Sequence, residues 1–130
     1  MAGRPIYKPS SFRNVECDGK VVGFSFDWKA QYYRSFTLSI LRDLIIKVDG
    51  QDINRDDIRI TVNNAQFTLE ECRTVVDPEY RWEFGEYATI TVLKEGGLSK
   101  GKHYIEAVQK IAPSYMPFVI EAPCNTEFEI

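Results

Sequence analysis

Apolar and polar residues alternate with a period of two along most of the chain, and this period is typical of strands that bury one face. In residues 22–28 the apolar side chains Val22, Phe24, Phe26 and Trp28 fall on one face, while small or polar residues take the other. Similar apolar runs occupy residues 40–48, 58–62, 87–93 and 103–112. The pattern predicts a protein built from sheets, and we expect the last two of these runs to pair with each other.

Short turn signals and one helix signal separate the predicted strands. Asp49-Gly50 and Asn63-Asn64 tolerate the positive φ angles of tight hairpin turns. Residues 68–71 read Thr-Leu-Glu-Glu and fit a capping box, in which the Thr hydroxyl accepts a backbone hydrogen bond and the last Glu reaches back. We therefore expect two hairpin turns and a helical segment of one or two turns that ends near Arg73.

Seven or so short strands with one short helical segment predict an all-β fold. We expect an antiparallel β-sandwich of the immunoglobulin or fibronectin-like kind, with a small closed barrel as the alternative. The length of 130 residues suits a single domain over residues 1–130, with an N-terminal arm over about residues 1–12. Because Pro113, Pro117 and Pro123 interrupt the end of the chain, residues 119–130 are expected to form an edge strand or a C-terminal arm.

Composition and charge narrow the classes of partner. Apolar residues make up 44% of the chain and charged residues 27%, as in folded soluble proteins. The net charge of -3, without a basic cluster, argues against nucleic acid, and no apolar run is long enough to cross a membrane. Since the N-terminus lacks an apolar secretory segment and the three cysteines lack the spacing of a zinc site, we expect a cytoplasmic protein with free thiols.

Few residues in the sequence are suited to catalysis. The one histidine, His103, lies in no pattern that places a nucleophile, and we expect it on the surface or on an edge strand. Asp56-Asp57 falls in a polar turn and Glu70-Glu71 in a first helical turn, so neither pair faces across a cleft as glycosidase carboxylates do. We therefore expect neither a catalytic residue nor a metal site in this chain.

Aromatic loop segments are the most distinctive remaining feature. Residues 32–36 follow the first long strand, residues 113–118 follow the last, and Tyr80 and Trp82 lie in an irregular stretch between strands. Aromatic residues, Arg and Met are enriched at the buried centres of protein interfaces. Three interpretations stay open at this point: a protein interface, rings that plug the ends of the sandwich, and a carbohydrate-binding module that stacks sugars on Trp28, Tyr80 and Trp82.

Five pieces of the chain, in this order, match a family pattern. They are Tyr32-Tyr33-Arg34-Ser35 with Leu38-Ser39, Leu44 to Gly50 with Asp57-Ile58-Arg59, Phe67 to Glu71, Gly96-Gly97-Leu98, and Tyr115-Met116-Pro117. With them the chain resembles, from about Val21 to Phe118, the β subunit of bacterial C-glycoside deglycosidases. The family often has Gly where this chain has Ser35, and the first twelve and last ten residues fall outside the resemblance.

The resemblance implies that the chain is one subunit of a carbon–carbon lyase. The family cleaves 3-oxo-C-glycosides by β-elimination, after a base removes the proton at sugar C2 next to the ketone. A histidine and a divalent ion, usually manganese, supply the base and the Lewis acid from a TIM-barrel, sugar-isomerase-like α subunit. This chain is then expected to be non-catalytic, to hold no cofactor of its own and to leave most substrate contacts to the α subunit.

The same resemblance assigns a place to the aromatic segments. We expect them to dock against the α subunit near the mouth of its active site, exclude water and shape the aglycone pocket. The expected interface residues are Tyr32, Tyr33, Arg34, Ser35, Tyr115, Met116, Pro117 and Phe118, with Tyr80 and Trp82 as secondary candidates. A free-standing carbohydrate-binding module is the alternative function, and an autonomous glycosidase is a third.

Overall fold

A computed structural model describes residue 7 and residues 11–29, 36–75, 78–82, 86–112 and 120–130. The predicted all-β fold is confirmed, since two antiparallel sheets are present with one short α-helix. Among the described residues no helix is long and apolar enough to cross a membrane.

The strands have the following bounds. They are β1 (Arg13–Cys17), β2 (Lys20–Lys29), β3 (Phe36–Thr37), β4 (Leu41–Val48), β5 (Gln51–Asp52), β6 (Ile58–Val62), β7 (Ala65–Thr68), β8 (Arg81–Trp82), β9 (Tyr87–Leu93), β10 (Lys102–Ile111) and β11 (Ile120–Glu129). The helical segments are η1 (Leu38–Ile40), η2 (Arg55–Asp57), α1 (Leu69–Cys72) and η3 (Pro78–Tyr80). Four of these strands, β4, β6, β9 and β10, correspond closely to the apolar runs of the sequence.

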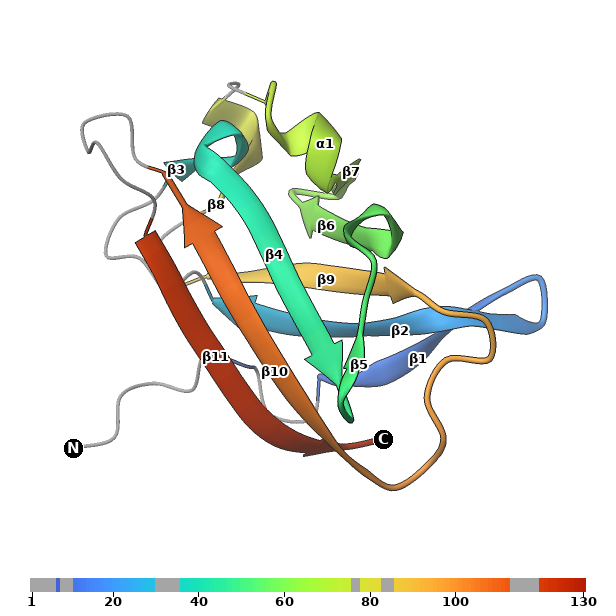
Figure 1. Cartoon of the computed structure of the whole chain (residues 1–130). Coiled ribbons are helices and arrows are strands. Elements are labelled where there is room, and N and C mark those ends of the chain that lie inside the picture. The colour runs from blue at the N-terminus through green and yellow to red at the C-terminus, as the bar shows by residue number, and fades with distance from the viewer. Residues whose placement is uncertain (1–6, 8–10, 30–35, 76–77, 83–85, 113–119) are drawn as a thin grey trace.

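Two sheets pack face to face to enclose the core. The five-stranded sheet has the order β1-β2-β9-β6-β7 and the four-stranded sheet the order β11-β10-β4-β5, while β3 and β8 form a small third sheet. In Figure 1 the strands of the four-stranded sheet cross in front of those of the five-stranded sheet at a steep angle. The alternating residues Phe24, Phe26 and Trp28 of β2 are fully buried, as the sequence predicts.

Three tight turns depend on residues with left-handed backbone angles. Asp49-Gly50 joins β4 to β5 with φ angles of 51° and 82°, and Asn63-Asn64 joins β6 to β7 with 50° and 64°, so both predicted turns are confirmed. Asp18-Gly19 joins β1 to β2 with 52° and 79°. This hairpin has the same turn signal, which the sequence analysis missed.

The predicted capping box begins α1. The Thr68 hydroxyl accepts from the Glu71 backbone N–H at 3.0 Å, and the Glu71 carboxylate accepts from the Thr68 backbone N–H at 2.8 Å. Two backbone donors at the start of the helix are thereby satisfied, which stabilises a helix of a single turn. The helix ends at Cys72, one residue before the predicted end.

Removing this cap has a predictable cost. We expect Thr68→Ala to lower the free energy of unfolding by about 1 kcal/mol, because one backbone donor loses its acceptor. Urea denaturation measures this change. The control Thr68→Ser keeps the hydroxyl and should stay close to the unsubstituted protein, so an equal loss in both variants would contradict the capping role.

One predicted pairing is wrong. The runs at 87–93 and 103–112 do not pair, because β9 is bonded on both sides by β2 and β6, and β10 by β11 and β4. Residues 94–101 therefore connect the two sheets rather than close a hairpin. His103 consequently lies on an interior strand and not on an edge strand.

The two ends of the chain add to the sheets. Residues 120–129 form β11, which pairs with β10 from Lys102↔Glu129 to Ile111↔Ile120 and is an edge strand, one of the two predicted possibilities. Near the N-terminus, Tyr7 is buried and forms an isolated bridge with Trp28. Cys17 and Cys72 are free thiols, and burial raises the pKa of Cys72 to about 12, which makes it unreactive.

Candidate functional site

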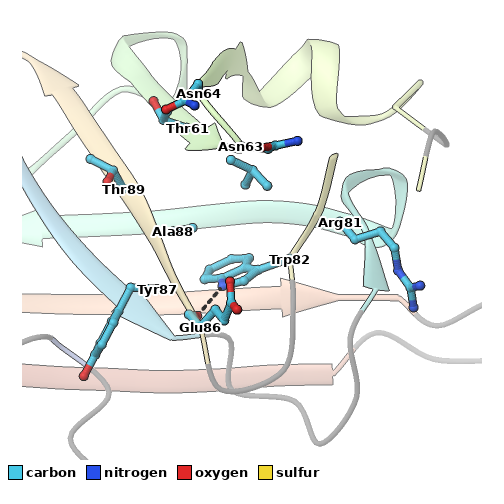
Figure 2. A pocket seen from close by; sticks show the side chains of 10 residues that line it. Thr61, Asn63, Asn64, Arg81, Trp82, Glu86, Tyr87, Ala88 and Thr89 are labelled. Atoms are coloured by element: carbon cyan, nitrogen blue, oxygen red, sulfur yellow. Dashed lines mark hydrogen bonds between the residues drawn. The ribbon is translucent and has the colours of Figure 1, made fainter. Parts of the chain in front are cut away.

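A pocket of about 380 Å³ opens where β6, β8 and β9 meet (Figure 2). The β6–β7 turn contributes Asn63 and Asn64, β8 contributes Arg81 and Trp82, and the start of β9 contributes Tyr87 and Thr89. The remaining lining residues are Thr61, Val62, Glu86 and Ala88. Its hydroxyl, amide and charged groups make it a surface for hydrogen bonding.

Trp82 forms part of the wall of this pocket and makes several contacts within the chain. Its indole Nε1 donates to the Glu86 carbonyl at 3.2 Å, shown as a dashed line in Figure 2. Its ring lies 6.4 Å from the ring of Trp28, and its backbone pairs with Phe36. Because its exposed fraction is only 1%, Trp82 supports the wall of the pocket rather than presenting a face to solvent.

The other secondary candidate, Tyr80, packs outside the pocket lining. Its ring meets Phe67 edge to face at 5.3 Å and is half-buried. With Trp28 at 0% and Trp82 at 1% exposure, two of the three proposed sugar-stacking rings have no accessible face. A carbohydrate-binding module needs exposed rings on which sugars can stack. Trp28 and Trp82 do not provide them, because both rings are buried in the core.

The rim of the pocket is polar and partly fixed by hydrogen bonds. Asn63 donates from its side chain to the Glu79 carbonyl at 3.1 Å, which joins the β6–β7 turn to η3. Lys29 places its ammonium 5.0 Å from the centroid of the Tyr87 ring. Arg81 and Glu86 are exposed charges of opposite sign at this rim. The rim can therefore bind polar groups of either charge.

The eight primary interface candidates, which fall within 32–35 and 115–118, lie outside the described residues. The described residues next to these segments can still be placed. Lys29 pairs with Tyr87, and its carbonyl accepts from Gln109 Nε2 at 2.9 Å.

The other described residues that border these segments are Phe36, Ala112 and Ile120. Phe36 pairs with Trp82, Ile111 pairs with Ile120, and the Ala112 N–H donates to the Ile40 carbonyl at 2.8 Å. The described residues on either side of both segments thus lie at the end of the sandwich that carries the pocket.

The single histidine lies at the other end of β10. His103 Nδ1 is 2.5 Å from Asp49 Oδ2, and His103 Nε2 is 2.7 Å from the Ser99 carbonyl oxygen. The hydrogen bond to Asp49, followed by that to Ser99, raises the pKa of His103, and the pKa of Asp49 is lowered mainly by the same bond to His103. Both ring nitrogens are engaged within the chain, so this histidine is not poised as a base for a bound substrate.

The two acidic pairs lie in the first turns of two helical segments, η2 and α1. Glu70 forms ion pairs with Arg55 at 3.8 Å and Arg73 at 3.9 Å, and Glu71 belongs to the capping box. Asn54 accepts from the Asp56 N–H at 2.9 Å at the start of η2. Within the described parts of the chain no three His, Cys, Asp or Glu side chains gather as a metal site.

Sequence reasoning found Trp82 and missed the other lining residues of the pocket. Thr61 lies in β6, Asn63 in the turn after it and Thr89 in β9, and the antiparallel pairing of β6 with β9 places Thr61 opposite Thr89. No local motif links these positions. The Asn63-Asn64 turn signal was the one available hint, and it indicates a turn rather than a site.

Comparisons with known proteins agree with one another. The family model described as "C-glycoside deglycosidase beta subunit" matches residues 2–115. A C-glycoside deglycosidase beta subunit of Eubacterium cellulosolvens is 34% identical over 119 residues, which cover 91% of this chain and 80% of that protein. A 3'-dehydrocarminate deglycosidase beta subunit of a Microbacterium species is 28% identical over 95 residues, covering 73% and 70%. The family match includes most of the first twelve residues, which the sequence analysis had left outside.

Proposed function

Since this chain belongs to the family of C-glycoside deglycosidase beta subunits, we propose that it is the small subunit of a heteromeric enzyme that cleaves C-glycosides. The observation that carries the proposal is the family match over residues 2–115, together with 34% identity to a named beta subunit. The fold fits this role, because a small β-sandwich offers loops at its ends for contact with a larger subunit. We place this complex in the cytoplasm.

The proposed reaction breaks the carbon–carbon bond between a sugar and an aromatic aglycone. The substrate is a 3-oxo-C-glycoside, whose ketone acidifies the hydrogen at C2. A base removes that proton, the enolate forms, and the aryl group takes up a proton and leaves from C1, as in a β-elimination. The base and a divalent ion, expected to be manganese, belong to a TIM-barrel α subunit, where the metal would stabilise the enolate.

We propose that this chain supplies no catalytic group. Its one histidine donates or accepts at both ring nitrogens within the chain, and it lies at the opposite end of β10 from the pocket. Burial holds Cys72 in its neutral form, with a pKa of about 12. These contacts support a structural role for the residues that would otherwise be the first candidates for catalysis.

The proposed interface lies at the pocket end of the sandwich. The segments with Tyr32, Tyr33, Arg34 and Ser35 and with Tyr115, Met116, Pro117 and Phe118 are flanked by described residues at that end. The buried ring of Trp82 packs against Trp28 beneath the surface at this end of the sandwich. The chain would then exclude water from the α-subunit active site and shape the entrance for the aglycone.

Co-expression with a sugar-isomerase-like barrel protein encoded beside this chain tests the proposal. We expect a stable hetero-oligomer that cleaves a 3-oxo-C-glycoside, with neither chain active alone. Size-exclusion chromatography with mass determination gives the composition, and release of the free aglycone gives the turnover. A monomer that ignores the barrel protein, or a single chain that turns over the substrate, would contradict the proposal.

A further inference from the structure

The connection between β9 and β10 is attached to both sheets at adjacent residues. Asn14 of β1 holds Leu98 twice, donating to its carbonyl at 2.9 Å and accepting from its N–H at 2.9 Å. The next residue, Ser99, is held by the His103 side chain of β10 at 2.7 Å. Leu98 is thus fixed to the five-stranded sheet and Ser99 to the four-stranded sheet.

The His103 ring is itself held from three directions. Asp49, in the β4–β5 turn, lies 2.5 Å from its Nδ1, and the other Asp49 oxygen accepts from the Tyr104 N–H at 2.9 Å. Phe128 of β11 stacks on the ring with centroids 5.4 Å apart. The side chain is only 9% exposed. The ring therefore has little freedom to turn away from either partner.

The two hydrogen-bond partners of the ring determine whether Nδ1 and Nε2 must both carry a hydrogen. The Asp49 carboxylate and the Ser99 carbonyl are both acceptors, so each ring nitrogen must carry a hydrogen to bond them. The imidazolium ion has two N–H groups, whereas neutral imidazole has one. In the neutral ring the remaining hydrogen is kept at Nδ1, because a charged carboxylate is the stronger acceptor. The Nε2 lone pair then faces the lone pairs of the Ser99 carbonyl, and that contact becomes repulsive.

We propose that His103 is a proton-controlled clasp on the connection between the two sheets. The protonated ring donates one hydrogen bond to the Ser99 carbonyl, which ties the connection to β10, and a second to the Asp49 carboxylate. The neutral ring keeps its hydrogen bond to Asp49 and releases Ser99. The connection then stays bonded through Leu98 to Asn14, through the Gly96 N–H to the Val21 carbonyl, and through Gly101 to Ile130. This device lies in the fold of the chain and does not depend on the proposed function.

The charged groups around the ring give the direction of the pH dependence. Among the described residues Asp49 is the ionised group that faces the ring, while β11 presents Phe128. Lys100 is exposed, and Lys102 projects from the opposite face of β10. The Asp49 and Ser99 hydrogen bonds raise the pKa of His103 above its ordinary value of 6.5. The clasp is therefore closed at pH values below 6.5 and opens as the pH rises through the raised pKa.

Nuclear magnetic resonance of the full chain tests the clasp directly. Long-range proton–nitrogen spectra across the imidazole titration should show a pKa above the ordinary value and a neutral form protonated at Nδ1. The Gly101 N–H, which donates to the Ile130 carbonyl at 3.1 Å, should exchange about tenfold faster in the open state after correction for hydroxide catalysis. A neutral form protonated at Nε2, an unshifted pKa or unchanged exchange of Gly101 would each overturn the proposal.

Two variants serve as matched controls. His103→Gln cannot titrate, so the pH step in Gly101 exchange should vanish, and a step that persists would assign it to another group. Asp49→Asn suits the positive φ of 51° and keeps an acceptor for Tyr104, but it removes the charge, so the His103 pKa should fall toward its ordinary value. If His103→Gln does not fold, the spectra of the unsubstituted protein still decide.

Discussion

Gly23→Ala is expected to lower the free energy of unfolding by about 3 kcal/mol, the upper part of the range for an added methyl group in a packed structure. Gly23 lies in β2 opposite Leu93, and a Cβ at this position would come within 2.0 Å of the Val92 carbonyl oxygen and 3.1 Å of the Leu93 Cα. These are backbone atoms of the central strand β9, so they cannot move without disturbing the ladder. Thermal unfolding should show a midpoint lower by about 10 °C.

A second glycine separates this steric effect from backbone preference. Gly50 has a φ of +82°, and a Cβ added there would meet no atom within 4 Å. Gly50→Ala therefore costs only the strain of the left-handed conformation, about 1–2 kcal/mol. We expect the loss at Gly23 to exceed the loss at Gly50. Equal losses would contradict the steric origin, and an unchanged midpoint for Gly23→Ala would show that β2 and β9 separate easily at this point.

The strands themselves could be predicted because their signals are local. Alternation marks β2 and β9, and turn residues with positive φ mark the ends of β4 and β6. The short strand β1 was missed, since Arg13–Cys17 has no clear alternation and its residues are exposed or half-buried. A local pattern detects a strand only where one face is buried.

Strand pairing could not be predicted in the same way. β9 and β10 follow one another in the sequence, yet β9 pairs with β2 and β6 because its buried residues Ile90 and Val92 complete the face that carries Phe24 and Phe26. Which sheet a strand joins depends on contacts between residues far apart in the chain. The environment of His103 was missed for the same reason, because Asp49 lies 54 positions away.

The candidate site also has a part that local sequence could predict and a part that depends on contacts between distant residues. Residue types marked the aromatic segments, because aromatic residues, Arg and Met are enriched at the buried centres of interfaces. Residue types could not show that Trp82 is buried in the core and therefore not accessible to a partner. The pocket was not predictable, since its three walls meet only when β6 and β9 are in register.

The double variant Tyr33→Ala with Met116→Ala is expected to weaken the complex with the α subunit by about 100-fold or more. Residues at the centre of an interface each contribute about 2 kcal/mol or more when they are hot spots, and each 1.4 kcal/mol corresponds to a tenfold change in Kd. The two residues belong to different segments, and the described residues next to both segments lie at the pocket end of the sandwich. Titration calorimetry measures the affinity, and aglycone release at subunit concentrations below the new Kd measures the loss of turnover.

Tyr104→Ala is the matched control for this prediction. Tyr104 is also a large aromatic residue with 41% exposure, but it lies near the start of β10, at the end of the sandwich away from the pocket. The Tyr104→Ala variant should therefore bind the α subunit with the same affinity as the unsubstituted chain. If the double variant assembles and turns over like the unsubstituted chain, the interface does not use these segments. If Tyr104→Ala weakens binding as much as the double variant, the α subunit contacts the opposite end of the sandwich, and the pocket end is left without the role proposed for it.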